Sequence, residues 1–272
     1  MRYQCLRFLK DSFNRDKFLC LVFACYGFSL TAIAQQKIFT SSNAHAHNDY
    51  NHPAPFYTAF NAGFGSIEAD IFPVNGILCV AHGKSEIQPQ LTLKSLYIDP
   101  LLNELAANNS RRVQLLVDIK ENYEVSLDLL IREIEPLKKY LSTPKKSKSL
   151  IILISGDRPP PAEYKNYPAY IFFDDDLKLP HSTEEWRRVG LVSLPFVEFS
   201  AWKGENPLEQ KDKKLLQHCI DSVHLAGKKI RFWAAPDNES SWRMQMKLGV
   251  DLIGTDKIEE LVNFLRSRSK KK

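Results

Sequence analysis

The chain has 272 residues, a net charge of +5, 25% charged residues and 44% hydrophobic residues. This balance excludes disordered and fibrous proteins, because the apolar fraction can fill a core and Gly and Pro are few. The 5 cysteines are too few for a disulfide scaffold. The mild charge does not favour binding of nucleic acid, and the length fits one or two domains.

The first 34 residues resemble a secretory signal peptide. Basic residues are spread over positions 1–17, an uncharged apolar stretch runs from Phe18 to Ala34, and Ala32-Ile33-Ala34 supplies small residues for cleavage. We therefore expect export to the periplasm or the extracellular medium, with one mature domain over residues 35–272. An uncleaved membrane anchor is the alternative, because this apolar stretch is at the short end of a membrane span.

Short apolar runs rich in β-branched residues alternate with helical patterns along the rest of the chain. The expected strands are Thr40–His45, Ser66–Phe72, Ile77–Ala81, Val113–Ile119, Leu150–Ser155, Ala169–Phe173, Leu191–Leu194, Ile230–Ala234 and Asp251–Gly254. Strands that alternate with helices favour parallel pairing. The number of strands and the length predict an α/β fold, a single (β/α)8 TIM barrel. An open doubly wound sheet is the alternative, but no glycine-rich phosphate loop follows the first strand.

Helical periodicity predicts most of the connecting elements. The segments concerned are Val125–Tyr140, Pro207–Ala226, Ser240–Lys247 and Ile258–Arg266. A further helix is expected to begin near Asp99, with Asp99 as N-cap and Pro100 at the first helical position. Asn75-Gly76 predicts a hairpin turn between two strands.

Polar residues end several of these apolar strands, and the carboxyl ends of barrel strands form the active-site face. Asn43 to Tyr50 closes the first strand with unusual polar density, including His45 and His47. Glu68 and Asp70 alternate onto one side of the next strand, which in a barrel is the lumen. Unpaired carboxylates are costly there, so the pair predicts a cation between them.

Two further strand ends extend this group. His82 follows the hairpin strand and returns to the same rim, where it is a candidate acid or base. Asp118 would be a third oxygen ligand, and Lys120 would either hold a phosphate or position the carboxylates. Hard oxygen ligands favour one divalent cation, Mg²⁺ or Ca²⁺, over zinc. A cation with two histidines is suited to phosphodiester cleavage.

This series of motifs resembles the phospholipase C-like phosphodiesterase superfamily, which includes the glycerophosphodiester phosphodiesterases. Glu68-Ala69-Asp70 is similar to the Glu-x-Asp of that superfamily, and Asp118-Ile119-Lys120 is similar to its acid-x-Lys. His47-Asn48-Asp49-Tyr50 resembles the His-Asn-Thr-Tyr of eukaryotic phosphoinositide phospholipases C. The opening motif is similar to that of the altered-inheritance-of-mitochondria type.

The resemblance implies a barrel enzyme that hydrolyses a glycerophosphodiester or a phospholipid-type substrate. It implies the following site: catalytic His47 and His82, with His45 as the alternative to His47; Lys120 beside them; metal ligands Glu68, Asp70, Asp118 and Asn48; and Trp233 in the substrate pocket. The substrate would be a small molecule or a lipid, and a lipid would bring the protein to a membrane surface. The sequence leaves the oligomeric state open.

One departure from the family bears on the substrate. Glycerophosphodiesterases open with His-Arg-Gly, whose Arg holds phosphate, and that Arg is missing here. Arg158 also ends a strand and is a candidate replacement. Two alternative functions stay open: a metal-dependent hydrolase of the polymerase-and-histidinol-phosphatase or amidohydrolase type, with His45 and His47 as ligands, and a catalytically silent barrel that binds an anionic ligand.

Overall fold

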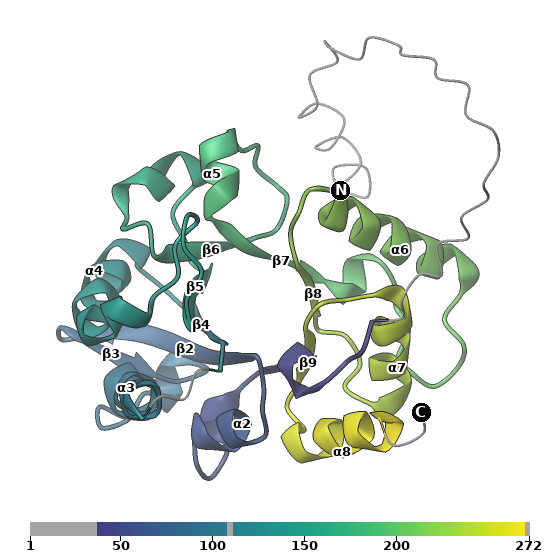
Figure 1. The fold of residues 1–272 in the computed structure, drawn as a ribbon, viewed down its shortest axis with the longest axis horizontal. Coiled ribbons are helices and arrows are strands. Elements are labelled where there is room, and N and C mark those ends of the chain that lie inside the picture. Colours follow the sequence, from purple (N-terminus) through teal and green to yellow (C-terminus); the bar gives the residue numbers. More distant parts are fainter. Residues whose placement is uncertain (1–36, 108–110, 270–272) are drawn as a thin grey trace.

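The computed structural model describes residues 37–107 and 111–269, so the predicted signal peptide lies outside the described residues. Eight parallel strands form a ring with helices around it (Figure 1), which confirms the predicted parallel α/β barrel. The order around the sheet is β8-β7-β6-β5-β4-β2-β1-β9. These strands are β1 (Ala44–Ala46), β2 (Ser66–Val74), β4 (Val113–Ile119), β5 (Leu150–Gly156), β6 (Ile171–Asp175), β7 (Val189–Pro195), β8 (Ile230–Trp233) and β9 (Ile253–Thr255).

The barrel is nearly closed, and the seam lies between β8 and β9. An isolated parallel bridge joins Arg231 to Leu252 across this seam. The amide of Asp251 also donates to the carbonyl of Ile230, at 3.0 Å. A few hydrogen bonds therefore complete the ring where the other neighbouring strands are joined by ladders.

The antiparallel strand β3 (Ile77–Val80) folds back on β2 through the predicted hairpin turn. Asn75 and Gly76 adopt positive φ angles of 49° and 81°. Asn and Gly tolerate this left-handed conformation better than other residues, which explains why Asn-Gly forms the turn. The hairpin returns the chain to the same rim of the barrel at His82.

Helices follow most strands and cover the outside of the ring (Figure 1). They are α2 (Tyr57–Asn61), α3 (Asp99–Ala106), α4 (Tyr123–Glu133), α5 (Thr183–Arg188), α6 (Gln210–Leu225), α7 (Glu239–Leu248) and α8 (Ile258–Ser269). Side chains of Asn122 and Asn238 cap α4 and α7 by accepting backbone N–H bonds.

Two helix predictions need correction. Asp99 is not an N-cap, because a π-helical turn over Lys94–Ile98 leads directly into α3, and Lys94 pairs with the Asp99 carboxylate. The helix expected over residues 125–140 ends at Glu133 and continues as a 3₁₀ helix, Glu135–Tyr140. Pro136 accounts for the break, because it lacks an N–H and clashes with the preceding turn.

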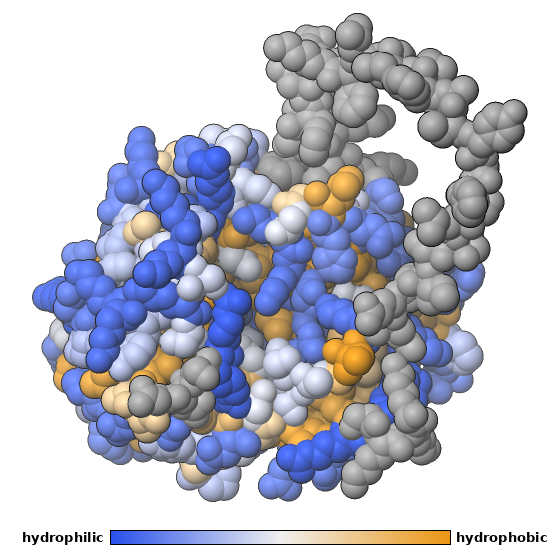
Figure 2. Space-filling view, viewed as in Figure 1, coloured by the Kyte–Doolittle hydropathy of each residue, from blue (hydrophilic) through white to orange (hydrophobic). Residues whose placement is uncertain are grey.

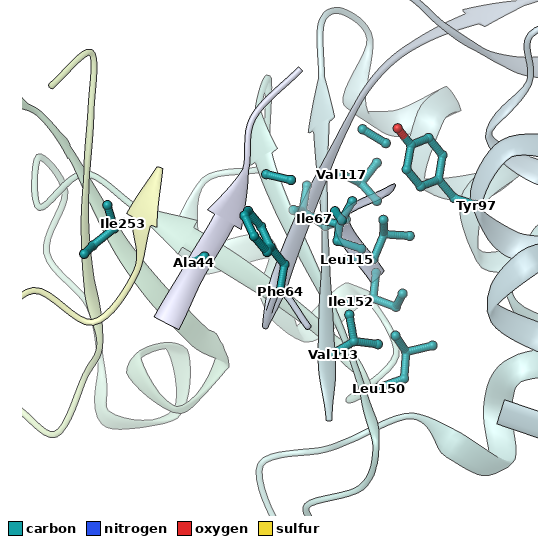
Figure 3. Packing of buried hydrophobic residues seen from close by; sticks show 14 of the residues in the cluster. Ala44, Phe64, Ile67, Tyr97, Val113, Leu115, Val117, Leu150, Ile152 and Ile253 are labelled. Atoms are coloured by element: carbon teal, nitrogen blue, oxygen red, sulfur yellow. The ribbon is translucent and has the colours of Figure 1, made fainter. Parts of the chain in front are cut away.

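The strands bury one face against the helices and the other inside the ring. The larger apolar cluster lies between strands and helices, and Figure 3 shows Ile67, Leu115 and Val117 packed together there. A separate small cluster contains Leu116, Leu153, Leu191 and Leu252. Since side chains alternate along a strand, these leucines share the inner face with the cavity-lining residues two positions further on. These leucines form an apolar layer inside the barrel, below the polar residues at its opening.

The surface seen in Figure 2 is mainly hydrophilic at its periphery, with smaller hydrophobic patches between. No helix within the described residues has the length and apolar character needed to cross a membrane.

Candidate active site

A cavity of about 620 Å³ opens at the carboxyl ends of the strands. Strands on both sides of the ring contribute to it. Its lining includes the predicted residues His47, Glu68, His82, Asp118, Lys120, Arg158 and Trp233. The fold therefore brings together residues that are up to 186 positions apart in the chain, in agreement with a site at the mouth of a barrel.

Three carboxylates converge at this mouth from β2 and β4. Glu68, Asp70 and Asp118 each place an oxygen within 4.8 Å of the other two. Asp70 stands opposite Asp118 in the parallel ladder of β2 and β4. Glu68 lies two residues before Asp70 and so shares its face of β2, as the alternation predicted.

Lys120 joins two of these carboxylates. Its Nζ lies 2.7 Å from Asp70 Oδ2 and 2.6 Å from Asp118 Oδ2. Burial would lower the pKa of Lys120, but the two aspartates raise it above its ordinary value. Burial and Glu68 raise the pKa of Asp70, and Lys120 opposes this rise. Of the two roles expected for Lys120, the geometry favours positioning of the carboxylates.

Glu68 is held by Arg231 of β8 and by His45 of the neighbouring strand β1. Its Oε2 accepts a hydrogen bond from Arg231 Nη1 at 2.9 Å and from His45 Nε2 at 2.6 Å. Burial alone would raise the pKa of Glu68, but Arg231 and His45 hold it well below its ordinary value. Glu68 is therefore an ionised carboxylate inside the barrel.

The carboxylates leave oxygens available for a cation. In the described part of the chain, every hydrogen bond to Glu68, Asp70 or Asp118 falls on a single oxygen of each carboxylate. Gly156, with φ of 73°, faces the other oxygen of Asp118, and a Cβ there would lie 2.8 Å from it. Three carboxylates with a free oxygen each, beside a position kept clear by glycine, fit a hard divalent cation.

His45 lies beneath the site and is fully buried. Gln114 Nε2 donates to Ser66 Oγ at 3.0 Å, and Ser66 Oγ is 2.8 Å from His45 Nδ1. His45 Nε2 lies against both Glu68 Oε2, which only accepts, and Arg231 Nη1, which only donates. Burial and Arg231 lower the pKa of His45 to about 4, so the ring is neutral at pH 7.

His47 lies at the open mouth and is paired with an aspartate from the end of β9. Its Nδ1 is 2.7 Å from Asp256 Oδ1, and this hydrogen bond raises the pKa of His47. In this pairing Nδ1 carries a proton and donates it to the Asp256 carboxylate, so Nε2 is the ring nitrogen left for other partners. Asn48 Nδ2 lies near both groups, 3.0 Å from His47 Nδ1 and 3.3 Å from Asp256 Oδ1.

His82 and Tyr50 meet at Asp70. The Tyr50 hydroxyl is 2.8 Å from Asp70 Oδ2 and 2.7 Å from the amide oxygen of Asn48. His82 Nδ1 lies 3.3 Å from both Asp70 Oδ2 and the Tyr50 hydroxyl. The Tyr50 hydroxyl thus lies between Asn48 and the Asp70 carboxylate. The side chain of His82 is more than half exposed, with 58% of it accessible.

The second half of the mouth, built by β5 to β8, carries a different set of side chains. Asp174 is buried and accepts a hydrogen bond from Ser155 Oγ at 3.2 Å. Arg158 contacts Asp176 at 3.4 Å and lines the same cavity. Trp233 is 48% exposed at its edge, so it is free to contact a substrate and does not fill the barrel.

Sequence reasoning missed three residues that the geometry makes prominent. Arg231 and Trp233 alternate with Ile230 and Phe232 along β8, and this alternation could have placed Arg231 in the lumen. Tyr50 had no local signal beyond its place in the polar motif. Asp256 ends a strand, but its pairing with His47 depends on β1 and β9 being neighbours.

Two family models match separate parts of the chain. The family model described as AIM6-like phosphodiesterase domain matches residues 34–114, and that of the glycerophosphoryl diester phosphodiesterase family matches residues 229–259. The first match contains His45 to His82, and the second contains Arg231 to Asp256. The first match therefore covers β1 to β3, and the second covers β8 and β9 on both sides of the seam.

Two curated relatives and one solved structure extend the similarity. The chain is 27% identical to Altered inheritance of mitochondria protein 6 homolog of Arthroderma benhamiae, over 79% of this chain and 81% of the relative. It is 24% identical to Altered inheritance of mitochondria protein 6 of Eremothecium gossypii, over 88% and 73%. A glycerophosphodiester phosphodiesterase from Parabacteroides distasonis shares the fold, with a TM-score of 0.52 and 16% identity over 84% of this chain and 98% of that chain. The predicted resemblance to glycerophosphodiester phosphodiesterase-like proteins of the altered-inheritance-of-mitochondria type is therefore confirmed.

Proposed function

We propose that the protein is a phosphodiesterase that depends on one divalent cation, Mg²⁺ or Ca²⁺, and hydrolyses a glycerophosphodiester or phospholipid-type substrate. One observation carries the proposal: Glu68, Asp70 and Asp118 converge, and Glu68 and Asp118 line the same cavity as His47 and His82. The matches to phosphodiesterase families support the same reaction class.

The charges at the mouth fit this substrate class. Three carboxylates face two fixed cations, Lys120 and Arg231, and neutral His45 adds no charge, so the group with its carboxylates ionised would have an excess of one negative charge. A divalent cation would convert this to an excess of one positive charge. A phosphodiester carries a single negative charge and would neutralise it.

The residues divide the work as follows. A bound cation would supply Lewis-acid stabilisation of charge on a non-bridging phosphate oxygen. His47 is the general base, because Asp256 orients its ring and raises its pKa. His82 protonates the leaving oxygen. The attacking hydroxyl is water or a neighbouring hydroxyl of the substrate, and the latter would give a cyclic phosphate.

The hydrolase alternative fits the geometry less well. It requires both His45 and His47 as metal ligands, yet both ring nitrogens of His45 are engaged, by Ser66 and by Glu68. A silent barrel that binds an anion would keep the same cation site, so only turnover separates it from the enzyme.

Phosphorus NMR on the full-length protein tests the proposal. The panel holds glycerophosphodiesters, phosphatidylinositol, lysophospholipids and a diester without a neighbouring hydroxyl, each with Mg²⁺, with Ca²⁺ or with chelator. We expect cleavage that chelator abolishes, and the product identifies the bond that is cut. Absence of cleavage of every diester with either cation would contradict the proposal.

A matched pair of variants links the result to the carboxylates. Asp118→Asn removes one charged ligand and should abolish cation-dependent turnover. Asp157→Asn is the control, because Asp157 ends the next strand but its carboxylate accepts the amide of Tyr123 instead of joining the acidic group. The control should keep its turnover and its response to chelator.

A further inference from the structure

We propose that Arg231 binds the substrate phosphate and makes cation binding and phosphate binding mutually dependent. This inference rests on the proposed function and deepens it, since it assigns the anion-binding residue of the same site. The residue comes from β8, which is separated around the ring by β9 and β1 from β2, the strand of Glu68 that it contacts.

The contacts of Arg231 leave part of its guanidinium available. Only 5% of the residue is exposed. Its Nε donates to Ser193 Oγ at 3.2 Å, and its Nη1 lies against Glu68 Oε2 at 2.9 Å and against His45 Nε2. In the described part of the chain, Nη2 has no hydrogen-bond partner, and the residue lines the cavity. The side chain is fixed on one edge and has donors left for a ligand.

The position of Arg231 is unfavourable for a cation alone. A divalent cation on the free oxygen of Glu68 would share that carboxylate with the guanidinium, and two like charges on one carboxylate repel each other. Burial strengthens the repulsion, because little solvent screens it. Arg231 therefore lowers the affinity of the site for a free cation.

An oxyanion that touches both positive groups reverses this effect. The fork of guanidinium donors matches the oxygens of a phosphate, which also bind hard cations. Phosphate would then raise the affinity for the cation, and the cation would raise the affinity for phosphate by the same factor. The empty site would hold its cation weakly, and the loaded site would hold both tightly.

Arg158 provides a matched comparison in the same cavity. Its guanidinium contacts Asp176 at 3.4 Å and the carbonyl of Gly156 at 3.5 Å, and no contact joins it to Glu68, Asp70 or Asp118 within the described residues. An anion that bound Arg158 would therefore leave cation binding nearly unchanged. The coupling distinguishes the two arginines.

Isothermal titration of the full-length protein with Mg²⁺, with and without inorganic phosphate, tests the inference. For the wild type we expect phosphate to tighten Mg²⁺ binding about tenfold, a usual size for coupling between sites. Arg231→Gln should bind Mg²⁺ alone at least as tightly as the wild type and lose the tightening. Arg158→Gln should keep the tightening.

The conservative variant Arg231→Lys controls for a folding defect caused by loss of the charge. It keeps a positive charge at this position but lacks the forked donors of the guanidinium. It should bind Mg²⁺ like the wild type and show reduced coupling. Full coupling in Arg231→Lys or Arg231→Gln would overturn the inference, as would weaker binding of Mg²⁺ alone by a folded Arg231→Gln.

The two proposals fail in different ways. If the wild type binds neither Mg²⁺ nor Ca²⁺, with or without phosphate, the proposed function itself fails. The wild type could bind Mg²⁺ with an affinity that phosphate does not increase, or phosphate could increase that affinity equally in the wild type and the Arg231 variants. Either result would refute only the role of Arg231.

Discussion

The two halves of the barrel mouth are built differently. The half formed by β1, β2 and β4 places carboxylates, a lysine and two histidines in short contacts, most of them between 2.6 and 3.0 Å. In the half formed by β5 to β8, Arg231 meets Glu68 at 2.9 Å, but other contacts are longer, such as Arg158 to Asp176 at 3.4 Å, and Trp233 is exposed. Tight contacts preorganise charge for chemistry, whereas looser and partly exposed groups suit recognition of a substrate. The first half should therefore govern kcat and the second half KM.

The largest effect is expected from the histidines of the first half. His82→Ala should lower kcat at least ~100-fold with little change in KM, because it removes a proton donor used in the transition state. His47→Ala should do the same. Steady-state kinetics on the best substrate measures both. His224→Ala is the control, since His224 bonds to Asp251 away from the cavity, and near-wild-type turnover in a mouth variant would remove that histidine from the mechanism.

A smaller effect is expected from the aspartate behind His47. A base acts in its neutral form, so activity should rise with pH through the pKa of His47. The Asp256 hydrogen bond raises that pKa. Asp256→Asn should therefore shift the acid limb of the kcat/KM profile to lower pH and reduce the plateau about tenfold. An unmoved acid limb would assign that limb to another group.

The second half should respond in KM. Trp233→Ala removes a half-exposed ring at the edge of the cavity and should raise KM about 2- to 10-fold, the size of a single aromatic contact, while kcat stays near that of the wild type. Trp233→Phe keeps a ring and should recover most of the affinity. A fall in kcat with constant KM would break the division between the two halves.

The last effect concerns stability and has opposite signs in the two halves. Burial raises the pKa of Asp174 from 3.8 to about 6, although Arg231 and Arg158 oppose the rise. Between these values the unfolded chain ionises this group first, so the protein loses stability as pH rises through that range. Asp174→Asn should raise Tm at pH 8, by the equivalent of at most about 3 kcal/mol, and should leave it unchanged at pH 4.

Glu68 provides the contrasting case in the first half. Its pKa is held below its ordinary value, so its ionised form stabilises the fold above that value, and the contribution is lost as pH falls. Glu68→Gln should therefore lower Tm at pH 7, with the deficit shrinking toward acid pH. Thermal unfolding in chelator isolates these terms from cation binding. A change in Tm of the same sign in Asp174→Asn and Glu68→Gln would contradict this distinction between the two halves.

Much of the first half could be predicted from the sequence because its signals are local. Glu68 and Asp70 are two residues apart on one strand, and His82 follows within one hairpin. The local motif favoured His47 as the catalytic histidine and left His45 as the alternative. Only the depth of each residue in the barrel separates a fully buried ring from one at the mouth.

Arg231 and Asp256 make contacts that no local pattern contains. Arg231 meets Glu68 across 163 positions, and Asp256 meets His47 across 209. Both contacts require the ring to close, and a side chain's charge partner is not visible until it does. The short helix α5 was missed because six mostly polar residues show no apolar periodicity. The cap at Asp99 was wrong because the preceding turn is helical as well.

The seam between β8 and β9 has a consequence for the dynamics of the fold. Arg231 supplies both a backbone bridge across this seam and the side chain that grips Glu68 on β2. Any ligand that immobilises the guanidinium therefore also fastens the last strands to the first ones. Amide protons at the seam, such as those of Asp251 and Leu252, should exchange with deuterium more slowly once the mouth is occupied. The exchange rate of these amides would therefore report whether the site is occupied.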